Sequence, residues 1–196
     1  DIIGITMPIT TYNYQIRDVA AIPRIITEAV HIATTGRPGP VVIDLPKDVS
    51  EMKTSFYYDP EVTLPSYQPT IEPNALQVKK ILTQLKKAKK PLIVAGGGVN
   101  YANAAEELQA FAERYNIPVV STLLSLGVMP IEHPLSLGMG GMHGSYASNM
   151  ALMECDFMIN FGCRFADRLT GNPDTFAADA VVAHVDIDPA EIGKVV

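Results

Sequence analysis

The residues best suited to binding chemistry form short clusters that each follow an apolar segment. One cluster is Gly162-Cys163-Arg164-Phe165-Ala166-Asp167-Arg168, in which an arginine comes soon after a glycine. A guanidinium at such a place suits a phosphate or pyrophosphate, because it can donate two parallel hydrogen bonds to phosphate oxygens. The alternative is an arginine–aspartate ion pair within the loop, for which Asp167 is available. We expect Arg164 to contact a ligand.

A second cluster is acidic and reads Asp186-Ile187-Asp188-Pro189-Ala190-Glu191. Asp186 ends an apolar segment, where a carboxylate can accept a hydrogen bond from a ribose hydroxyl. Asp188, Pro189 and Glu191 fit the Ncap, N1 and N3 positions of a helix capping box. We therefore assign Asp186 to the ligand and Asp188 to the start of a helix.

Glycines supply a third feature. Gly96-Gly97-Gly98 would let the backbone approach a ligand and leave N–H groups for a phosphate, or it would form a sharp strand-to-helix turn. The dinucleotide fingerprint G-x-G-x-x-G fails, because Tyr101 stands where its last glycine belongs. Residues 138–144 hold four glycines beside His143, a composition typical of backbone packed against a flat ligand.

The remaining polar residues predict no catalytic group. The hydroxyls of Ser121 and Thr122 can either bind a cofactor or cap a short turn. No nucleophile elbow, P-loop or H-E-x-x-H motif occurs, and the four histidines are scattered, so we expect no metal site. From the residue types alone we therefore predict nucleotide binding, and no particular reaction.

The elements that must position these residues alternate between strand and helix. Apolar segments without alternation predict strands at 92–95, 117–120, 157–161 and 181–185. Stripes of helical period predict helices at 78–85, 104–115 and about 145–154, and Lys79, Lys80, Lys86 and Lys87 fall on the solvated face of the first. This pattern predicts an α/β fold with a doubly wound, mostly parallel, Rossmann-like sheet, whose strands end at one edge.

The first part of the chain predicts the tail of another α/β domain. A β-like run at 2–5 opens it, a helix follows from near Asp18 to Gly36, and a strand lies at 41–43. Residues 51–73 contain Pro60, Pro65, Pro69 and Pro73 and read as a linker. We expect domains at 1–50 and 74–196, the second incomplete at its C-terminus, in a piece of a longer polypeptide.

Composition excludes several classes of protein. Of 196 residues, 15 are Lys or Arg and 21 are Asp or Glu, which gives a net charge of −6 and argues against nucleic-acid binding. A hydrophobic content of 47% argues against disorder. The apolar runs are too short to span a membrane. Two cysteines without paired spacing fit a reducing compartment, so we expect the cytoplasm.

Taken together, the clusters resemble the large catalytic subunits of acetolactate synthase, also called acetohydroxyacid synthase, within the thiamine-diphosphate-dependent enzymes. The M-H-G and F-G-x-R-F-x-D-R-x-T-G segments are the most specific to this family, whereas G-R-P-G-P-V is shared across the superfamily. The matching segments run in order along the chain: I-P-R-I-I-x-E-A, T-G-R-P-G-P-V-V-I-D-L-P-K-D-V, K-K-P-L-I-V-A-G-G-G, I-P-V-V-S-T-L-L-S-L-G, G-M-G-G-M-H-G-S, F-G-C-R-F-A-D-R-L-T-G and H-V-D-I-D-P-A-E-I-G-K.

The resemblance implies specific domains and sites. The three parts of the chain would be the end of a pyrimidine-binding domain, a linker and a central domain that holds FAD. Lys47 and Asp167 match positions near the substrate channel. The positions that match the family's FAD contacts are Arg37, Gly97, Thr122, Leu123, Gly141, Met142, His143, Gly162, Arg164, Ala166, Asp186 and Ile187.

Two residues depart from the family pattern. Thr11 stands where the family usually has a lysine, which removes a charge near the channel. Ala166 stands where many members have aspartate, and this changes little if the cofactor contact is made through the backbone.

The resemblance also implies an activity for the parent enzyme. Acetolactate synthase is a transferase that condenses two pyruvates, or pyruvate with 2-oxobutanoate, with loss of CO₂, in branched-chain amino-acid biosynthesis. It uses thiamine diphosphate and Mg²⁺, which are held by segments that this sequence does not contain. A homodimer or homotetramer and a regulatory small subunit are implied as partners. We expect these 196 residues to be catalytically inactive alone, with no catalytic residue and no metal ligand.

Two alternatives stay open. A related thiamine-diphosphate enzyme, such as a pyruvate oxidase or a catabolic acetolactate synthase without FAD, shares many of the motifs. A non-catalytic nucleotide-binding module of the sirtuin or electron-transfer-flavoprotein kind would share the sheet. The G-R-P-G-P-V segment argues against such a module, which has no use for it.

Overall fold

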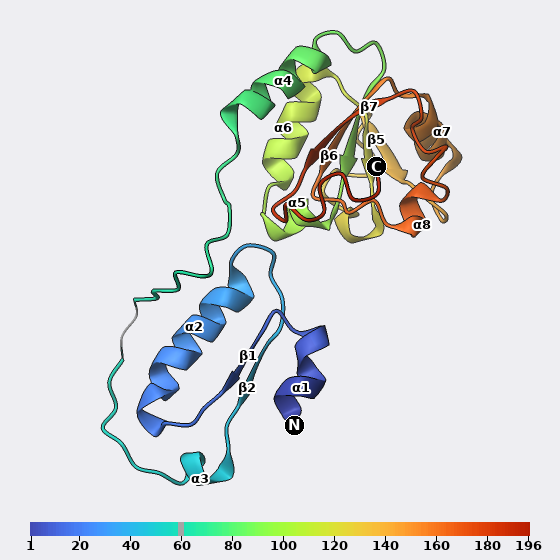
Figure 1. Cartoon of the computed structure of the whole chain (residues 1–196). Coiled ribbons are helices and arrows are strands. Elements are labelled where there is room, and N and C mark those ends of the chain that lie inside the picture. Colours follow the sequence, from blue (N-terminus) through green and yellow to red (C-terminus); the bar gives the residue numbers. More distant parts are fainter. Residues whose placement is uncertain (59–60) are drawn as a thin grey trace. The chain divides into compact units, whose positions relative to one another are not determined.

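The structure is a computed structural model that describes residues 1–58 and 61–196, so the linker residue Pro60 lies outside the described residues. The chain divides into two compact units, Asp1–Glu72 and Pro73–Val196 (Figure 1). Within the described ranges, none of the helices combines the length and the apolar character that a membrane span needs.

The first unit is built on two parallel strands, β1 (Tyr12–Gln15) and β2 (Val41–Asp44), joined through helix α2 (Ile22–Thr34). Ile16, Ile25 and Val49 form its small core. Its shorter elements are α1 (Ile2–Thr6), α3 (Lys47–Ser50) and the 3-10 helices η1 (Met7–Ile9) and η2 (Val19–Ala21).

The boundaries of α2 follow from local chemistry. The Asp18 carboxylate accepts a hydrogen bond from the N–H of Ala20 at 3.0 Å and caps the turn that leads into the helix. After the helix, Gly36 has a φ of +58°, the left-handed conformation that glycine adopts without steric cost. The prediction that this helix ends at Gly36 is confirmed.

The predicted β-like run at 2–5 is wrong, because this segment forms α1. The Asp1 side chain accepts a hydrogen bond from the N–H of Gly4 at 3.0 Å and acts as the N-cap. A short apolar run without alternation fits a helix or a strand equally, and here the cap decides. The strand of this region is instead β1, where tyrosines alternate with polar residues.

The second unit contains a five-stranded, fully parallel sheet, which confirms the predicted α/β fold class. The strand order is β5-β4-β3-β6-β7, so the chain winds outward from β3 in one direction and then returns to build the other half. The strands are β3 (Pro91–Ala95), β4 (Val119–Ser121), β5 (Ser136–Met139), β6 (Phe157–Phe161) and β7 (Val181–Val185).

Helices cover both faces of this sheet. Figure 1 shows α4 (Ala75–Leu85) and α6 (Ala105–Tyr115) on one face, and α7 (Tyr146–Glu154) and α8 (Asp167–Thr170) on the other. Ile93 and Ile159 pack into the core on the α4 and α6 side, whereas Leu92 and Met158 pack into the core on the α7 and α8 side. Both faces are buried, so the strands read as continuous apolar runs in the sequence.

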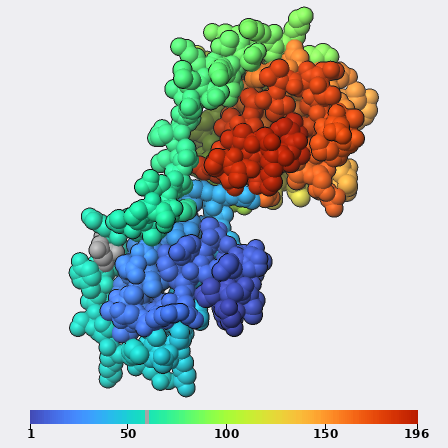
Figure 2. All heavy atoms as spheres, in the orientation of Figure 1, coloured from blue at the N-terminus to red at the C-terminus, as the bar shows by residue number. Residues whose placement is uncertain are grey.

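The prediction of a helix that starts at Asp188 is wrong, because residues 189–193 form turns and residue 194 a bend. The Asp188 carboxylate does accept a hydrogen bond from the N–H of Ala190 at 3.0 Å, as a cap would. Gly193, with a φ of +68°, then reverses the backbone before a second helical turn can form. Figure 2 shows these last residues, in dark red, on the surface of the second unit.

Candidate functional site

The predicted binding residues of the second unit gather at the carboxyl-terminal edge of its sheet. The strands are in parallel register, with Ala95 opposite both Ser121 and Phe161, and Phe161 opposite Val185. The loops that follow these strands therefore emerge side by side. The winding direction reverses between β3 and β6, and such a reversal is where sheets of this kind bind ligands.

Two of the three consecutive glycines serve close packing. A Cβ on Gly96 would lie 2.2 Å from the carbonyl oxygen of Gly162, and a Cβ on Gly98 would lie 2.7 Å from the Cα of Gly162. The N–H of Gly98 donates to that same carbonyl oxygen at 3.1 Å. For Gly96 and Gly98 the structure thus favours the turn over ligand contact. A Cβ on Gly97 would lie 3.1 Å from Cβ of Leu124, a looser contact with no overlap with the backbone of Gly162, so Gly97 keeps its place among the candidates.

A buried asparagine fixes the turn that leads to Arg164. Asn160 is fully buried in β6 and donates a hydrogen bond from Nδ2 to the carbonyl oxygen of Cys163 at 2.6 Å. Its Oδ1 accepts one from the N–H of Cys163 at 3.0 Å. The sequence signal was a single polar residue inside the apolar run Phe157–Phe161, which our sequence analysis did not use.

Arg164 is exposed, and in the part of the chain that the structure describes it has no ion pair and no hydrogen bond from its side chain. Asp167 pairs with Arg168 instead, at 3.3 Å, and both of these side chains are exposed. The loop therefore does contain an arginine–aspartate pair, but with the other arginine. The guanidinium of Arg164 is left available for an anionic ligand.

The pKa of the Cys163 thiol is shifted by burial and by two charged groups nearby. Burial raises the pKa of this thiol, the Asp186 carboxylate raises it further, and the Arg164 guanidinium opposes the shift. Arg164 and Asp186 follow different strands, yet both are near enough to act on the same group. The guanidinium of Arg164 fits the phosphates of a nucleotide, and the carboxylate of Asp186 fits its ribose.

The glycine-rich loop after β5 is held by Asn149 of α7. Its Oδ1 accepts a hydrogen bond from the N–H of Gly141 at 2.8 Å, and its Nδ2 donates to the Gly141 carbonyl oxygen at 3.0 Å. The N–H of Met142 donates to the carbonyl oxygen of Arg168 at 2.8 Å. Anchored in this way, the loop exposes the side chains of Met142 and His143.

The hydroxyl of Thr122 contributes to a turn. It lies 3.2 Å from the Ser125 hydroxyl, which in turn donates to the carbonyl oxygen of Ala95. The turn-capping alternative thus accounts for this hydroxyl. Leu123, the next residue, begins the 3-10 helix η3 (Leu123–Ser125) with its side chain exposed.

Asp186 follows β7, and its carboxylate is almost buried, with 9% of the side chain exposed. Its Oδ1 accepts a hydrogen bond from the N–H of Asp188 at 2.9 Å. Its Oδ2 lies 3.9 Å from Nε2 of His184, whose side chain is 5% exposed. Ile187, beside it, is exposed and offers an apolar contact.

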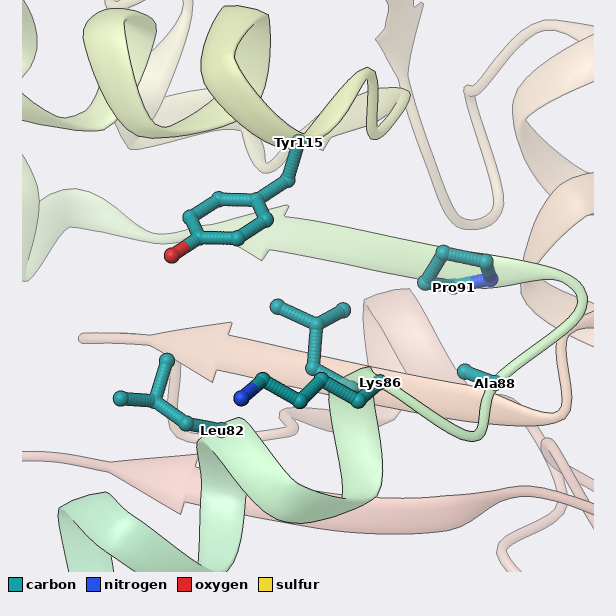
Figure 3. A pocket seen from close by; sticks show the side chains of 6 residues that line it. Leu82, Lys86, Ala88, Pro91 and Tyr115 are labelled. Carbon is teal, nitrogen blue, oxygen red and sulfur yellow. The ribbon is translucent and has the colours of Figure 1, made fainter.

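Two hollows lie at opposite ends of the parallel strands. One, of about 510 Å³, is lined by residues that include Arg164, Ala166, Asp167 and Thr170, so it coincides with the predicted residues after β6. The other, of about 280 Å³, lies near Pro91 at the start of β3. Figure 3 shows it between the last turn of α4 and Tyr115 of α6, with Lys86 beside it. No predicted site residue lines this second hollow.

Three residues named from the sequence belong to the first unit. Arg37 lies in the connection between α2 and β2. Lys47 begins α3, where its ammonium pairs with Glu51 at 3.7 Å and both side chains are exposed. Thr11 precedes β1, and its N–H donates to the carbonyl oxygen of Pro40 at 2.8 Å. Among residues 1–58 and 61–196, no three His, Cys, Asp or Glu residues are placed to share a metal ion.

Residues 78–196 match the family described as thiamine pyrophosphate enzyme, central domain. The chain belongs to the thiamine pyrophosphate enzymes. This family membership, predicted from the motifs, is thereby confirmed. The strand-end loops described above are therefore those of a thiamine pyrophosphate enzyme central domain.

This thiamine pyrophosphate enzyme chain is also similar, over essentially its whole length, to large subunits of acetolactate synthase. It is 58% identical to the acetolactate synthase large subunit of Lactococcus lactis, covering all of this chain and 34% of that protein. The identity is 50% with the large subunit of Corynebacterium glutamicum, of which 31% is covered. It is 49% with the probable large subunit of Methanocaldococcus jannaschii, of which 33% is covered. The chain spans about a third of the length of these relatives.

Proposed function

We propose that the carboxyl-terminal edge of the five-stranded sheet binds FAD, in a chain that forms part of an acetolactate synthase. The observation that carries the FAD proposal is the exposed guanidinium of Arg164 beside a hollow of about 510 Å³, which is lined by residues that follow β6 and β7 at the carboxyl ends of the strands. The proposed FAD contacts in the second unit are Gly97, Thr122, Leu123, Gly141, Met142, His143, Gly162, Arg164, Ala166, Asp186 and Ile187. A contact from Arg37, which belongs to the first unit, stays a prediction from the resemblance.

The chemistry of these residues fits a flavin dinucleotide. Arg164 would hold the pyrophosphate, because a guanidinium matches phosphate oxygens in charge and shape. The Asp186 carboxylate would accept hydrogen bonds from ribose hydroxyls. Exposed Leu123, Met142 and Ile187 offer apolar surface for the aromatic rings. His184, whose buried ring nitrogens lack partners among the described residues, adds an unused polar group next to Asp186.

For the parent enzyme we propose the condensation of two pyruvates, or of pyruvate with 2-oxobutanoate, in branched-chain amino-acid biosynthesis. Thiamine diphosphate, when bound with Mg²⁺, supplies the carbanion chemistry. Lys47 and Asp167 would line the substrate channel. Homo-oligomerisation, a regulatory small subunit and a cytoplasmic location belong to the same proposal. Its support is the similarity to large subunits at 58% and 50% identity.

The FAD proposal is tested by titrating the 196-residue protein with FAD and following the flavin fluorescence. We expect saturable quenching, and competition by ADP if the pyrophosphate contributes to binding. Riboflavin, which lacks the phosphates, is the matched control and should bind more weakly. An absence of quenching at high flavin concentration would remove the site.

We expect the 196-residue chain to make no acetolactate by itself. The sequence contains no G-D-G…N motif that could hold a diphosphate through Mg²⁺, and no segment that matches the glutamate that activates thiamine in the family. The purified chain should be mixed with thiamine diphosphate, Mg²⁺, FAD and pyruvate, and acetolactate measured against a buffer blank. Product above the blank, after a control for host enzyme, would contradict this expectation.

A further inference from the structure

His184 is the one residue whose buried side-chain nitrogens lack hydrogen-bond partners in the described part of the chain. It lies on β7, its side chain is 5% exposed, and neither Nδ1 nor Nε2 is bonded. Burying a polar group without a partner destabilises a protein, so such groups are rare and call for a reason. An ordinary core position would be filled better by an apolar side chain.

The first neighbour of this imidazole is the Asp186 carboxylate. Oδ1 of Asp186 is fixed by the N–H of Asp188, whereas Oδ2 faces Nε2 of His184 at 3.9 Å. That separation is about 1 Å longer than a hydrogen bond, so a small movement of either side chain would close it. Among the described residues, no hydrogen bond is made to Oδ2 of Asp186.

The second neighbour is Phe165, which lies edge-on to the imidazole with ring centroids 5.1 Å apart. Phe165 is buried, has a φ of +52° and follows Arg164 directly. A positive φ is costly for an aromatic residue and persists only where its surroundings enforce it. His184 therefore contacts both loops that supply the charged groups of the proposed site.

We propose that His184 is a positioning residue that orients the Asp186 carboxylate for the ligand, a role that rests on the proposed FAD site. The N–H at Nε2 donates to Oδ2 of Asp186 and holds the carboxylate so that it can accept from a ligand hydroxyl. His184 itself touches no ligand.

Two substitutions separate this role from simple packing. His184→Gln places an amide nitrogen near the position of Nε2 and keeps a donor for Asp186. His184→Met fills a similar volume without a donor. We expect FAD affinity to fall about tenfold in His184→Met and to stay within about threefold of wild type in His184→Gln, as one charge-assisted hydrogen bond implies. His133→Gln, at the Glu113 pair, is the control and should leave the affinity unchanged.

A double-mutant cycle with Asp186→Asn supplies a measurement whose result would not change if His184 served packing alone. If His184 acts through the carboxylate, His184→Met should lose most of its effect on FAD affinity in the Asp186→Asn background. Equal effects in both backgrounds, or equal losses in His184→Gln and His184→Met, would overturn the proposal.

An NMR measurement keeps the inference testable even if wild type fails to bind FAD. Long-range ¹H–¹⁵N spectra of the histidine rings should show His184 protonated at Nε2, with a nitrogen shift that changes in Asp186→Asn. An insensitive His184 signal would overturn the positioning role whatever the flavin titration shows. A sensitive signal with no FAD binding would instead reject FAD as the ligand and retain the pair.

Discussion

The charged residues at positions 164–168, which follow β6, differ in whether their side chains are paired. Asp167 pairs with Arg168, with 76% and 72% of their side chains exposed, so this pair contributes little to stability. Arg164 stays apart from both and lies beside the larger hollow. The same short loop thus holds one arginine already paired on the surface and one available to a ligand.

Replacing Arg164 with alanine should weaken FAD binding far more than replacing Asp167. A hydrogen bond between a charged group and a phosphate is worth roughly 1.5–3 kcal/mol, so we expect a loss of about tenfold to a hundredfold for Arg164→Ala. For Asp167→Ala we expect less than about fivefold, because only an exposed pair is lost. Fluorescence titrations of both variants measure this, and equal effects would contradict the assignment.

Ala166 occupies the N-cap of α8 and provides no side-chain hydrogen bond there. Asparagine and aspartate are favoured at this position because they accept hydrogen bonds from N–H groups of the first turn. Here the N–H of Arg168 already donates to Oδ1 of Asp167 at 2.9 Å, so a new cap would compete with that bond. We expect Ala166→Asn to raise the free energy of unfolding by no more than about 0.5 kcal/mol, the low end of the range for caps, measured by urea denaturation. Ala166→Val, which cannot cap, is the control. A gain of the same size in both variants would point to packing as the cause.

At the scale of elements, α5 (Gly97–Tyr101) packs closely against the residue that follows β6. Gly98 meets Gly162 backbone to backbone, and Gly162 has a φ of +64°. No side chain fits between them. The close approach of these two segments therefore depends on two glycines that are 64 positions apart in the sequence.

Gly98→Ala should lower the free energy of unfolding by about 1–3 kcal/mol, because its Cβ would lie 2.7 Å from a backbone atom that cannot move alone. Gly97→Ala is the matched control: its Cβ would lie 3.1 Å from Cβ of Leu124, a contact that a displacement of a few tenths of an ångström relieves. Urea denaturation of both variants measures the difference. A loss for Gly97→Ala as large as that for Gly98→Ala would contradict the packing role.

The sequence predicted the elements whose signal is local. Residues 157–161 and 181–185 form β6 and β7 at the predicted boundaries, because both are uninterrupted apolar runs. β5 (Ser136–Met139) was missed, since Gly138 interrupts it and its pairing with β4 is a tertiary effect. β1 was missed because the apolar run before it looked like the strand.

The candidate site shows the same division. Arg164 and Asp186 were found because each follows an apolar run, and the carboxyl ends of parallel strands share an edge. Asn149 was not found, since its role depends on Gly141 in another loop. Asn160 and His184 were not found although Cys163 and Asp186 are close to them in the sequence, because both roles depend on the path that the following loop takes. Gly96 and Gly98 could be assigned to packing only once Gly162 was seen opposite them.

At the scale of the whole molecule, the division into two units predicts where a protease will act. Phe56, Tyr57 and Tyr58 are consecutive, 80%, 74% and 58% exposed, and lie outside any helix or strand. Chymotrypsin at low concentration should therefore cut first after one of them, as mass spectrometry of the early fragments would show.

A variant with serine at all three positions should lose this early cut. The other exposed aromatic residues lie in helices or a strand, such as Tyr101 in α5, Tyr146 in α7 and Tyr12 in β1, and should be cut later. First cleavage inside residues 73–196 would contradict this description of the chain.

The lysines near the smaller hollow have a consequence for how the molecule behaves at a charged interface. Residues 73–105 contain six lysines and no aspartate or glutamate, although the whole chain has a net charge of −6. All six lysines are exposed, on α4 and on the turn that leads to β3. The remaining 163 residues then carry a net charge of −12, so the charge of the protein is strongly polarised. An anionic matrix would adsorb the protein by this segment at a pH where its overall charge predicts repulsion.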